Sequence, residues 1–353
     1  MKILTVIGAR PQFIKIALLS KELKKNFDEV IVHTGQHYDY EMSKVFFEQL
    51  DIPKPDYNLD IRKEDEVEQI TSMMLGLEKV MLHENPDLIM LIGDTNSTLA
   101  AALTASRLKI KCAHVESGTR MFDKKIPEEM NRIVADYISD MLFCPSLTAV
   151  ENLKSEGIKR GVFFTGDVMI DALMNYTPLA KKSKILEKLG LEPKKYILAT
   201  VHRQSNTNDK KKLSEIFSAF GKSGKKIAMP LHPRTRKYLD RYGLLGTFSK
   251  RILITEPANY IDMLALQMNA KKIVTDSGGI QKEAYYLKVP CITLGNSTGW
   301  PETVSDGWNL LTGHDGEKIK KAINNFKPNS KQKKHYGNGN AIKKIVNLLR
   351  EVK

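Results

Sequence analysis

The stretch KKIVTDSGGIQKEA, residues 271–284, places an apolar run, a pair of glycines and a helix-like segment one directly after another. The apolar run predicts a strand that ends at Thr275, and Gly278 and Gly279 predict a tight joint from which a helix begins. Glu283 follows about one helical turn after that joint. A strand, a turn and a helix in this order are the repeating unit of parallel α/β sheets, so the stretch predicts that class of fold.

The same unit recurs along the chain in two series. Short runs rich in Val, Ile and Leu alternate with longer helix-like segments, which is typical of doubly wound parallel sheets. The predicted strands cover residues 2–7, 29–34, 88–93, 110–115, 141–145 and 162–166 in the first series, and 196–201, 226–231, 251–255, 271–275 and 290–295 in the second. We therefore expect two Rossmann-like α/β domains, joined within residues 167–195, with the carboxyl ends of their strands facing a common cleft that binds the ligand.

Charge and composition narrow the class of protein. The chain has 353 residues and a formal net charge of +14, from 55 Lys and Arg against 41 Asp and Glu. The basic residues are spread along the chain, often as Lys pairs, which favours solvated helix faces over a nucleic-acid-binding surface. A basic nucleic-acid-binding protein is the alternative that is not an enzyme. The positive charge also suits an anionic small-molecule substrate.

The sequence contains no pattern of a membrane or metal protein. No apolar run approaches the roughly 18 residues of a membrane helix, and the first residues read as a strand instead of a signal peptide, so we expect a cytoplasmic protein. Cys112, Cys144 and Cys291 lie far apart in apolar segments, and we expect them in the core. The eight histidines form no HExxH motif and no Cys/His cluster, so no metal site is expected.

Charged residues follow the predicted strands of the first series. In GARPQFIK, residues 8–15, Arg10 and Lys15 flank a predicted helix start and suit an anion, although an ordinary turn with exposed cations has the same pattern. In GDTNST, residues 93–98, Asp94 either caps the following helix itself or is available to a ligand because a neighbouring Thr, Asn or Ser is the cap.

Two further motifs add carboxylates. In HVESGTR, residues 114–120, Glu116 ends a strand, where a carboxylate needs solvent, a cation or a substrate, and His114 is expected as a core or supporting histidine. In PEEMNR, residues 127–132, Glu128 and Glu129 lie in the first turn of a predicted helix, a position that the helix dipole alone also explains.

The second series offers groups for a diphosphate. In TVHR, residues 200–203, His202 and Arg203 follow a strand and combine a group that titrates near neutrality with a permanent cation. The turn at residues 277–279 presents backbone N–H groups at a helix N-terminus, which favours an anion, and Glu283 then suits the hydroxyls of an adjacent ribose. The alternative is a glycine-rich turn followed by a surface glutamate.

Taken in order, the motifs GARPQFIK, GDTNST, HVESGTR, PEEMNR, TVHR, DSGGIQKEA and YGNGNA resemble those of the non-hydrolysing UDP-N-acetylglucosamine 2-epimerases over nearly the whole chain. The resemblance implies the glycosyltransferase-B fold, with an N-terminal domain over 1–168 that a C-terminal helix over 339–353 joins, and a UDP-binding domain over 169–338. It implies an isomerase that interconverts UDP-GlcNAc and UDP-ManNAc by eliminating and re-adding UDP, without a cofactor or metal. It also implies a homodimer.

The resemblance assigns roles to individual residues. The catalytic residues that it implies are Asp94, Glu116, Glu128 and His202. The substrate-binding residues that it implies are Arg10, Lys15, Arg203, Met263, Ser277, Gly278, Gly279 and Glu283. Of these, the cations, His202 and the turn at 277–279 would surround the diphosphate, Glu283 would bind the ribose, and Met263 would lie near the uracil.

One motif departs from the family pattern. GWPE, residues 299–302, stands where many bacterial members have ERPE, so that Trp300 replaces an arginine expected at the ligand. Tryptophan cannot supply that charge. An epimerase of a related UDP-sugar, such as a UDP-2,3-diacetamido sugar, is therefore an alternative, and a UDP-sugar glycosyltransferase of the same fold is another.

Overall fold

The computed structural model describes residues 1–36, 47–248 and 252–351. The chain forms two compact units, an N-terminal unit of Met1–Met174 with Lys334–Lys353 and a C-terminal unit of Asn175–Lys333. Helix α7 (Val168–Ala180) contains the boundary between Met174 and Asn175, and the chain re-enters the N-terminal unit at Lys334. Both units are built on parallel sheets with helices, which confirms the predicted α/β class.

The sheet of the N-terminal unit has seven strands in the order β3-β2-β1-β4-β5-β6-β7, and all its pairings are parallel. Its strands are β1 (Lys2–Ile7), β2 (Asp28–His33), β3 (Tyr57–Asn58), β4 (Leu88–Ile92), β5 (Lys111–Val115), β6 (Met141–Cys144) and β7 (Val162–Phe164). The strand order reverses between β1 and β4. In doubly wound sheets the ligand binds beyond the carboxyl ends of the strands at such a reversal.

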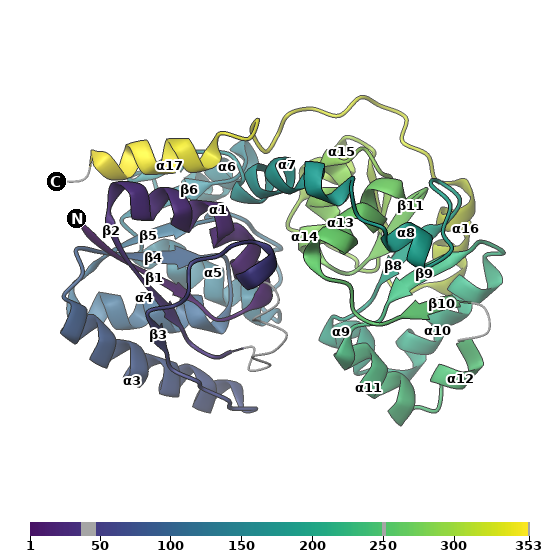
Figure 1. Cartoon of the computed structure of the whole chain (residues 1–353), viewed down its shortest axis with the longest axis horizontal. Coiled ribbons are helices and arrows are strands. Elements are labelled where there is room, and N and C mark those ends of the chain that lie inside the picture. The colour runs from purple at the N-terminus through teal and green to yellow at the C-terminus, as the bar shows by residue number, and fades with distance from the viewer. Residues whose placement is uncertain (37–46, 249–251, 352–353) are drawn as a thin grey trace. The chain divides into compact units, whose positions relative to one another are not determined.

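Helices cover this sheet because their apolar faces pack on its Val, Ile and Leu side chains. They are α1 (Arg10–Asn26), α3 (Glu66–Glu84), α4 (Asn96–Leu108), α5 (Pro127–Ile138), α6 (Leu147–Ser155) and α17 (Ala341–Arg350). The last helix, α17, packs beside α1 (Figure 1). Its start is held by Asp171, whose carboxylate accepts hydrogen bonds from the backbone N–H groups of Ala341 and Ile342 at 3.2 and 2.9 Å.

The C-terminal unit contains a six-stranded parallel sheet in the order β10-β9-β8-β11-β12-β13. Its strands are β8 (Ile197–Thr200), β9 (Ile227–Pro230), β10 (Ile252–Thr255), β11 (Lys272–Thr275), β12 (Cys291–Thr293) and β13 (Asn309–Leu311). Its helices are α8 (Ile185–Lys188), α9 (Gln204–Thr207), α10 (Lys210–Lys222), α11 (Pro233–Arg241), α12 (Leu245–Phe248), α13 (Tyr260–Asn269), α14 (Gly278–Tyr286), α15 (Pro301–Ser305) and α16 (Gly316–Asn325). Here the strand order reverses between β8 and β11.

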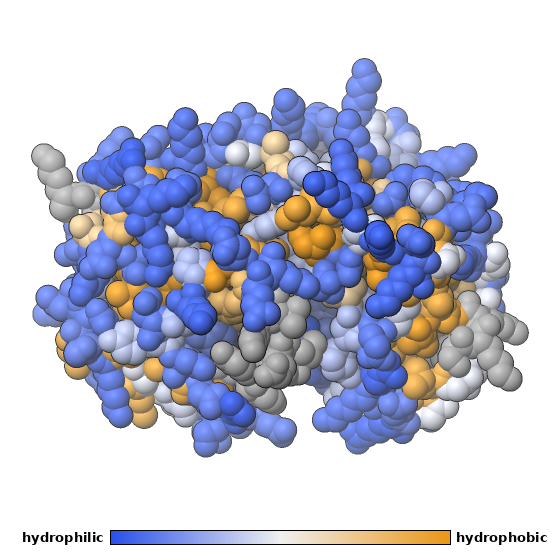
Figure 2. Space-filling view, in the orientation of Figure 1, coloured by the Kyte–Doolittle hydropathy of each residue, from blue (hydrophilic) through white to orange (hydrophobic). Residues whose placement is uncertain are grey.

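All the strands predicted from the sequence are present, with ends that differ by at most two residues. Two short strands, β3 and β13, were not predicted, because their sequences YN and NLL do not lie in apolar runs as long as those of the other strands. All three cysteines are buried, as expected. Among the described residues, no helix is both long and apolar enough to cross a membrane. The face of the molecule in Figure 2 is largely hydrophilic.

Candidate functional site

The turn after β1 is held against the end of β4 by a buried glutamine, Gln12. Its Oε1 atom accepts hydrogen bonds from the backbone N–H groups of Gly8 and Ala9 at 2.8 and 2.9 Å, and its Nε2 atom donates to the carbonyl oxygen of Ile92 at 2.9 Å. These bonds fix the start of α1 at the reversal of the strand order. Arg10, which begins α1 and is half-buried, therefore lies at the edge where a ligand of this sheet is expected.

Lys15 and Glu116 form a buried ion pair at the same edge. The Nζ atom of Lys15 lies 2.8 Å from Oε1 of Glu116, and both side chains are less than a tenth exposed. Gly93 lies against this pair, because a Cβ atom added to it would be 2.8 Å from Lys15 Nζ. Glu116 has φ = 75°, a left-handed conformation that is strained for a residue other than glycine. Such strain at a buried, charged residue is common at functional sites.

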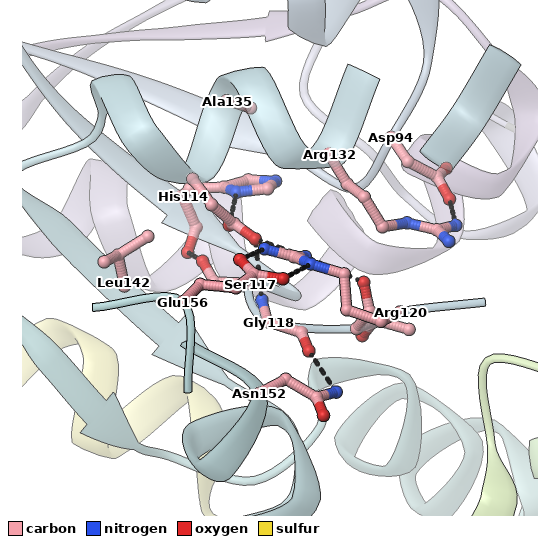
Figure 3. A network of polar contacts seen from close by, with 12 residues as sticks. Asp94, His114, Ser117, Gly118, Arg120, Arg132, Ala135, Leu142, Asn152 and Glu156 are labelled. Atoms are coloured by element: carbon pink, nitrogen blue, oxygen red, sulfur yellow. Dashed lines mark hydrogen bonds and ion pairs between the residues drawn. The ribbon is translucent and has the colours of Figure 1, made fainter. Parts of the chain in front are cut away.

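Asp94 is held by the first turns of α5. The guanidinium of Arg132 donates a hydrogen bond to the Asp94 carboxylate, a contact that Figure 3 shows, and Asn131 Nδ2 donates to the Asp94 carbonyl oxygen at 3.0 Å. The cap of α4 is Thr95, whose side chain accepts a hydrogen bond from the N–H group of Thr98. Of the two alternatives for Asp94, the structure excludes Asp94 as the cap, and its side chain pairs with Arg132.

The two glutamates of PEEMNR have different environments. Glu129 is buried, and its carboxylate accepts hydrogen bonds from the backbone N–H groups of Met121 and Phe122 and from Arg132 Nη1, at 2.7 to 3.1 Å. Glu128 is exposed, and no other described residue forms a hydrogen bond or ion pair with its carboxylate. Because Glu128 is four positions before Arg132, the two residues share one face of α5. Glu128 is thus on the side of the helix that contacts Asp94.

In the C-terminal unit, Asp276 organises the turn after β8. This carboxylate is 1% exposed and accepts hydrogen bonds from the backbone N–H groups of His202 and Arg203 at 2.9 to 3.0 Å, and from Asn206 Nδ2 at 3.0 Å. The His202 ring lies near that of His232, with 5.2 Å between the ring centroids. Asp276 directly precedes the glycine turn, so it connects the strand ends of β8 and β11.

The glycine turn begins α14, with Ser277 as the residue before the helix. A Cβ atom added to Gly278 would lie 3.2 Å from Nε1 of Trp300 and 3.9 Å from Nη2 of Arg203, so both side chains reach this turn. Gly279 follows in the first turn of α14 and is half-buried. The ammonium group of Lys282 lies 3.8 Å from the centroid of the Trp300 ring. Trp300 therefore replaces the family arginine at a position that contacts the turn.

Glu283 is buried in α14, and its Oε2 atom accepts a hydrogen bond from Gln267 Nε2 at 2.6 Å. Burial first, and the nearby carboxylate of Glu283 second, raise the pKa of Tyr260 well above its usual value. The hydroxyl group of Tyr260 has no hydrogen-bond partner among the described residues. Met263 lies one turn further along α13 than Tyr260, is half-buried and packs against the core of this unit.

The predicted residues therefore form two groups. In the N-terminal unit, the structure brings Lys15, Asp94 and Glu116 together at the ends of β4 and β5, with Glu128 on the adjoining face of α5. In the C-terminal unit, Asp276 connects the predicted residues. Its carboxylate accepts hydrogen bonds from the backbone N–H groups of His202 and Arg203, and it directly precedes the turn at 277–279. Within the described residues, no group of three or more His, Cys, Asp or Glu side chains could hold a metal ion.

Four polar residues that organise these groups were not predicted from the sequence, namely Gln12, Asn131, Arg132 and Asp276. All four lie inside the motifs that were singled out, but each is a polar residue beside a more conspicuous one. Their role depends on partners 37 to 80 positions away along the chain, such as Asp94 for Asn131 and Ile92 for Gln12. Asp276 directly follows the predicted strand that ends at Thr275, and this position could have identified it as a residue of the site.

Comparisons of the sequence and of the structure with known proteins identify the same family. A family model described as UDP-N-acetylglucosamine 2-epimerase matches residues 21–350. A protein of Methanococcus maripaludis named as a UDP-N-acetylglucosamine 2-epimerase homolog is 52% identical over 100% of both chains. The UDP-2,3-diacetamido-2,3-dideoxy-D-glucuronate 2-epimerase of Pseudomonas aeruginosa is 41% identical over 99% of both chains.

The fold agrees closely with a solved structure. The crystal structure of Methanocaldococcus jannaschii UDP-GlcNAc 2-epimerase in complex with UDP-GlcNAc and UDP matches with a TM-score of 0.94 and 41% identity, and the match covers 100% of both chains.

Proposed function

Since the chain belongs to the UDP-N-acetylglucosamine 2-epimerase family, we propose that it interconverts UDP-N-acetylglucosamine and UDP-N-acetylmannosamine by inverting C2 of the sugar. The observation that carries this proposal is the cluster of Lys15, Glu116, Asp94 and Arg132 where the strand order of the sheet reverses. Carboxylates held in place beside cations are the groups that proton transfer at a sugar carbon requires. Their position is the one where such sheets bind ligands.

The proposed route is an elimination followed by an addition. The C2 proton is only weakly acidic, so a free carbanion is avoided if the C1–O bond breaks as that proton leaves. The electron pair of the C2–H bond forms the C1=C2 double bond of 2-acetamidoglucal, and UDP departs with the electron pair of the C1–O bond. UDP then adds back to C1 while a proton reaches C2 from the opposite face. The sequence of steps contains no net oxidation.

We assign acid and base functions at C2 to Asp94, Glu116 and Glu128. The three carboxylates differ in surroundings, since Arg132 binds Asp94, Lys15 binds Glu116, and Glu128 is exposed. Carboxylates in different environments can hold a proton to different degrees, which a pair of acid and base groups needs.

We assign the binding of UDP chiefly to the C-terminal unit. The backbone N–H groups at Ser277, Gly278 and Gly279 would bind a phosphate at the N-terminus of α14, and Arg203 and His202 would neutralise the diphosphate as it leaves. Arg10 and Lys15 are the substrate-binding cations that we assign to the N-terminal unit. Glu283 would bind the ribose, and Met263 would contact the uracil. The reach of Arg203 and Trp300 to the glycine turn supports this assignment.

A UDP-2,3-diacetamido sugar is the second candidate substrate. It is favoured by the relative from Pseudomonas aeruginosa, whose named substrate is of this class, at 41% identity. Trp300, which stands where many bacterial members have an arginine, is the departure of this chain from the family pattern that makes a related UDP-sugar a candidate.

We also propose that the protein is a homodimer. Helix α3 exposes Val67, Leu75 and Leu82 on one face, with 71%, 63% and 64% of each side chain accessible. An exposed apolar stripe of this kind commonly marks a protein–protein contact. Light scattering on the purified protein measures the molar mass, and the substitution Leu75→Lys should shift it from dimer to monomer. A monomeric wild-type protein would exclude the proposal.

The function is tested by incubating the purified protein with UDP-GlcNAc in heavy water and following the sugar by NMR. We expect a manno product and deuterium at C2. A parallel incubation with a UDP-2,3-diacetamido sugar identifies the preferred substrate. Asp94→Asn serves as the inactive control. Absence of both the product and the deuterium in both incubations would refute the epimerase assignment, and a glycosyltransferase would leave C2 unlabelled.

A further inference from the structure

His114 lies at the centre of a buried polar network in the N-terminal unit (Figure 3). Its side chain, in β5, is 0% exposed. The Nδ1 atom lies 2.7 Å from Oδ1 of Asp136, and the Nε2 atom lies 2.7 Å from the carbonyl oxygen of Gly93. Carboxylate and carbonyl oxygens only accept hydrogen bonds, so both ring nitrogens must donate. A ring that donates from both nitrogens is doubly protonated and carries a positive charge.

The charges around the ring favour the same state. Asp136 also accepts hydrogen bonds from Arg120 Nη1 at 2.7 Å and from the Gly118 N–H group at 3.0 Å. Arg120 in turn donates two hydrogen bonds of 2.7 Å to the carboxylate of Glu156. The network therefore contains two carboxylates and one guanidinium. It is electrically neutral when His114 is charged, and the carboxylate of Glu156 is also partly exposed to solvent, with 23% of its side chain accessible.

The carboxyl group of Asp136 is ionised, as an acceptor of these hydrogen bonds must be. Burial alone would raise the pKa of this carboxyl group, but the hydrogen bonds and positive charges of His114 and Arg120 outweigh burial and hold the pKa below its usual value.

The carbonyl that His114 binds belongs to the turn that carries Asp94. Gly93 is in a left-handed conformation with φ = 63°, and its N–H group donates to the Val115 carbonyl oxygen at 3.0 Å. A Cβ atom added to Gly93 would point toward the side chains of Lys15 and Glu116. The bond from His114 is thus a second hydrogen bond to the backbone of Gly93, on the peptide that joins Gly93 to Asp94. It fixes the direction in which the chain leaves β4, and hence where the Asp94 side chain begins.

We propose that His114, kept as a buried imidazolium by Asp136, is a positioning residue that holds the Gly93–Asp94 turn in the geometry needed for proton transfer at C2. The inference rests on the proposed epimerase function. His114 does not touch the reacting atoms. It acts through the Gly93 carbonyl, so its effect should appear in kcat and not in the binding of UDP, which the C-terminal unit provides.

Two substitutions separate the two hydrogen bonds of the ring. The side chain of His114→Gln can place an N–H group near the position of Nε2, and it keeps the bond to Gly93. The side chain of His114→Asn can place an N–H group near the position of Nδ1, so this variant keeps only the bond to Asp136. Cys112→Ala is the matched control, because Cys112 is a buried core residue of the same strand that lies outside the network.

We expect His114→Asn to lower kcat by about 100-fold, the scale expected when a catalytic group is misplaced, with KM and the calorimetric affinity for UDP close to wild type. His114→Gln should retain much more activity than His114→Asn. Cys112→Ala should lose stability without losing kcat. If His114→Asn keeps the kcat of the Cys112→Ala variant, or if both His114 variants lose activity only in proportion to their unfolded fraction, the positioning role is wrong.

A measurement without substrate distinguishes this inference from the function itself. Nitrogen NMR of ¹⁵N-histidine-labelled wild-type protein at neutral pH should show both ring nitrogens of His114 protonated, with the His114→Gln variant used for assignment. One unprotonated nitrogen would overturn the imidazolium even if the protein is an active epimerase. Wild-type protein that shows both nitrogens protonated but leaves UDP-sugars unchanged would refute the proposed function while leaving the buried imidazolium in place.

Discussion

The Nζ atom of Lys15 lies 2.8 Å from Oε1 of Glu116, although the two residues are 101 positions apart in the chain. Lys15 is on α1, and Glu116 follows β5, so the pair joins elements on both sides of β4. Both side chains are buried, and a buried charge is stable only with a partner of opposite sign. The pair therefore fixes the positions of a cation and a carboxylate relative to the Asp94 turn before any ligand binds.

This pair predicts a strong energetic coupling. Lys15→Met and Glu116→Gln should each lower the free energy of unfolding, and the double variant should lose less than the sum, with a coupling of about 2 kcal/mol, in the range for neighbouring buried groups. Chemical denaturation of the four proteins measures the cycle. Additive losses would show that the two groups do not stabilise one another. Turnover should fall in all three variants.

The two adjacent glutamates of α5 should behave differently. Glu128→Gln should lower turnover by about 100-fold, the scale of a general acid or base, with little change in stability, because Glu128 is exposed. Glu129→Gln should instead lower the free energy of unfolding, because Glu129 is buried and binds two backbone N–H groups and Arg132. Kinetics and thermal denaturation of both variants test the contrast. A Glu128→Gln variant with normal turnover and a lowered free energy of unfolding would show that Glu128 is not an acid or base in the reaction.

The glycine turn should tolerate no side chain. In Gly278→Ala the new Cβ atom would lie 3.2 Å from Trp300 Nε1, in the space where a phosphate would approach the backbone. We expect the affinity for UDP to fall by about tenfold, or 1.4 kcal/mol, measured by calorimetry. Gly246→Ala is the control, since a Cβ atom there has nothing within 4 Å. Equal UDP affinity in both variants would place the phosphate elsewhere.

The stability of the N-terminal unit should depend on pH through Glu29. This buried residue accepts hydrogen bonds from Thr5 at 2.7 Å and from Ser20, and burial raises its pKa from 4.5 to about 7. A carboxyl group whose pKa is higher in the folded state holds its proton more tightly there. Its contribution to stability is therefore complete below pH 4.5 and is lost as the pH rises through about 7.

The full loss should be about 3 kcal/mol, from 1.36 kcal/mol for each pKa unit. Glu29→Gln should remove this pH dependence and should unfold at a higher denaturant concentration than the wild type at pH 8. Parallel denaturation curves of both proteins between pH 4.5 and pH 8 provide the measurement. A wild-type stability that rises steadily over this range, and equally in the variant, would contradict the role of Glu29.

Much of the site follows from patterns that are local in the sequence. The strand ends before Asp94, Glu116, His202 and the 277–279 turn were all predicted, because a buried parallel strand is a continuous apolar run and its end is marked by the first polar residue. The helix start at Pro127 was predicted for the same kind of reason, since proline is favoured in the first turn. Among the described residues, the strands that were not predicted are β3 and β13.

The functions of individual polar residues inside those motifs could not be predicted from local sequence patterns. Glu128 and Glu129 are equivalent in sequence, and only the position of the loop at Met121 and Phe122 makes one buried and the other exposed. Trp300 could be recognised as a departure from the family, but its contact with Gly278 and with Lys282 depends on how α14 and α15 pack.

By itself, the sequence determined the α/β class, the positions of the strand ends and the family, because hydrophobic periodicity and the residue types of the turns act over a few neighbouring residues. Only the tertiary structure decided which polar groups meet: Lys15 with Glu116, Arg132 with Asp94, and His114 with Asp136 and the carbonyl of Gly93. The physical reason is that a buried charge is stable only where the fold supplies a partner, and those partners come from distant parts of the chain.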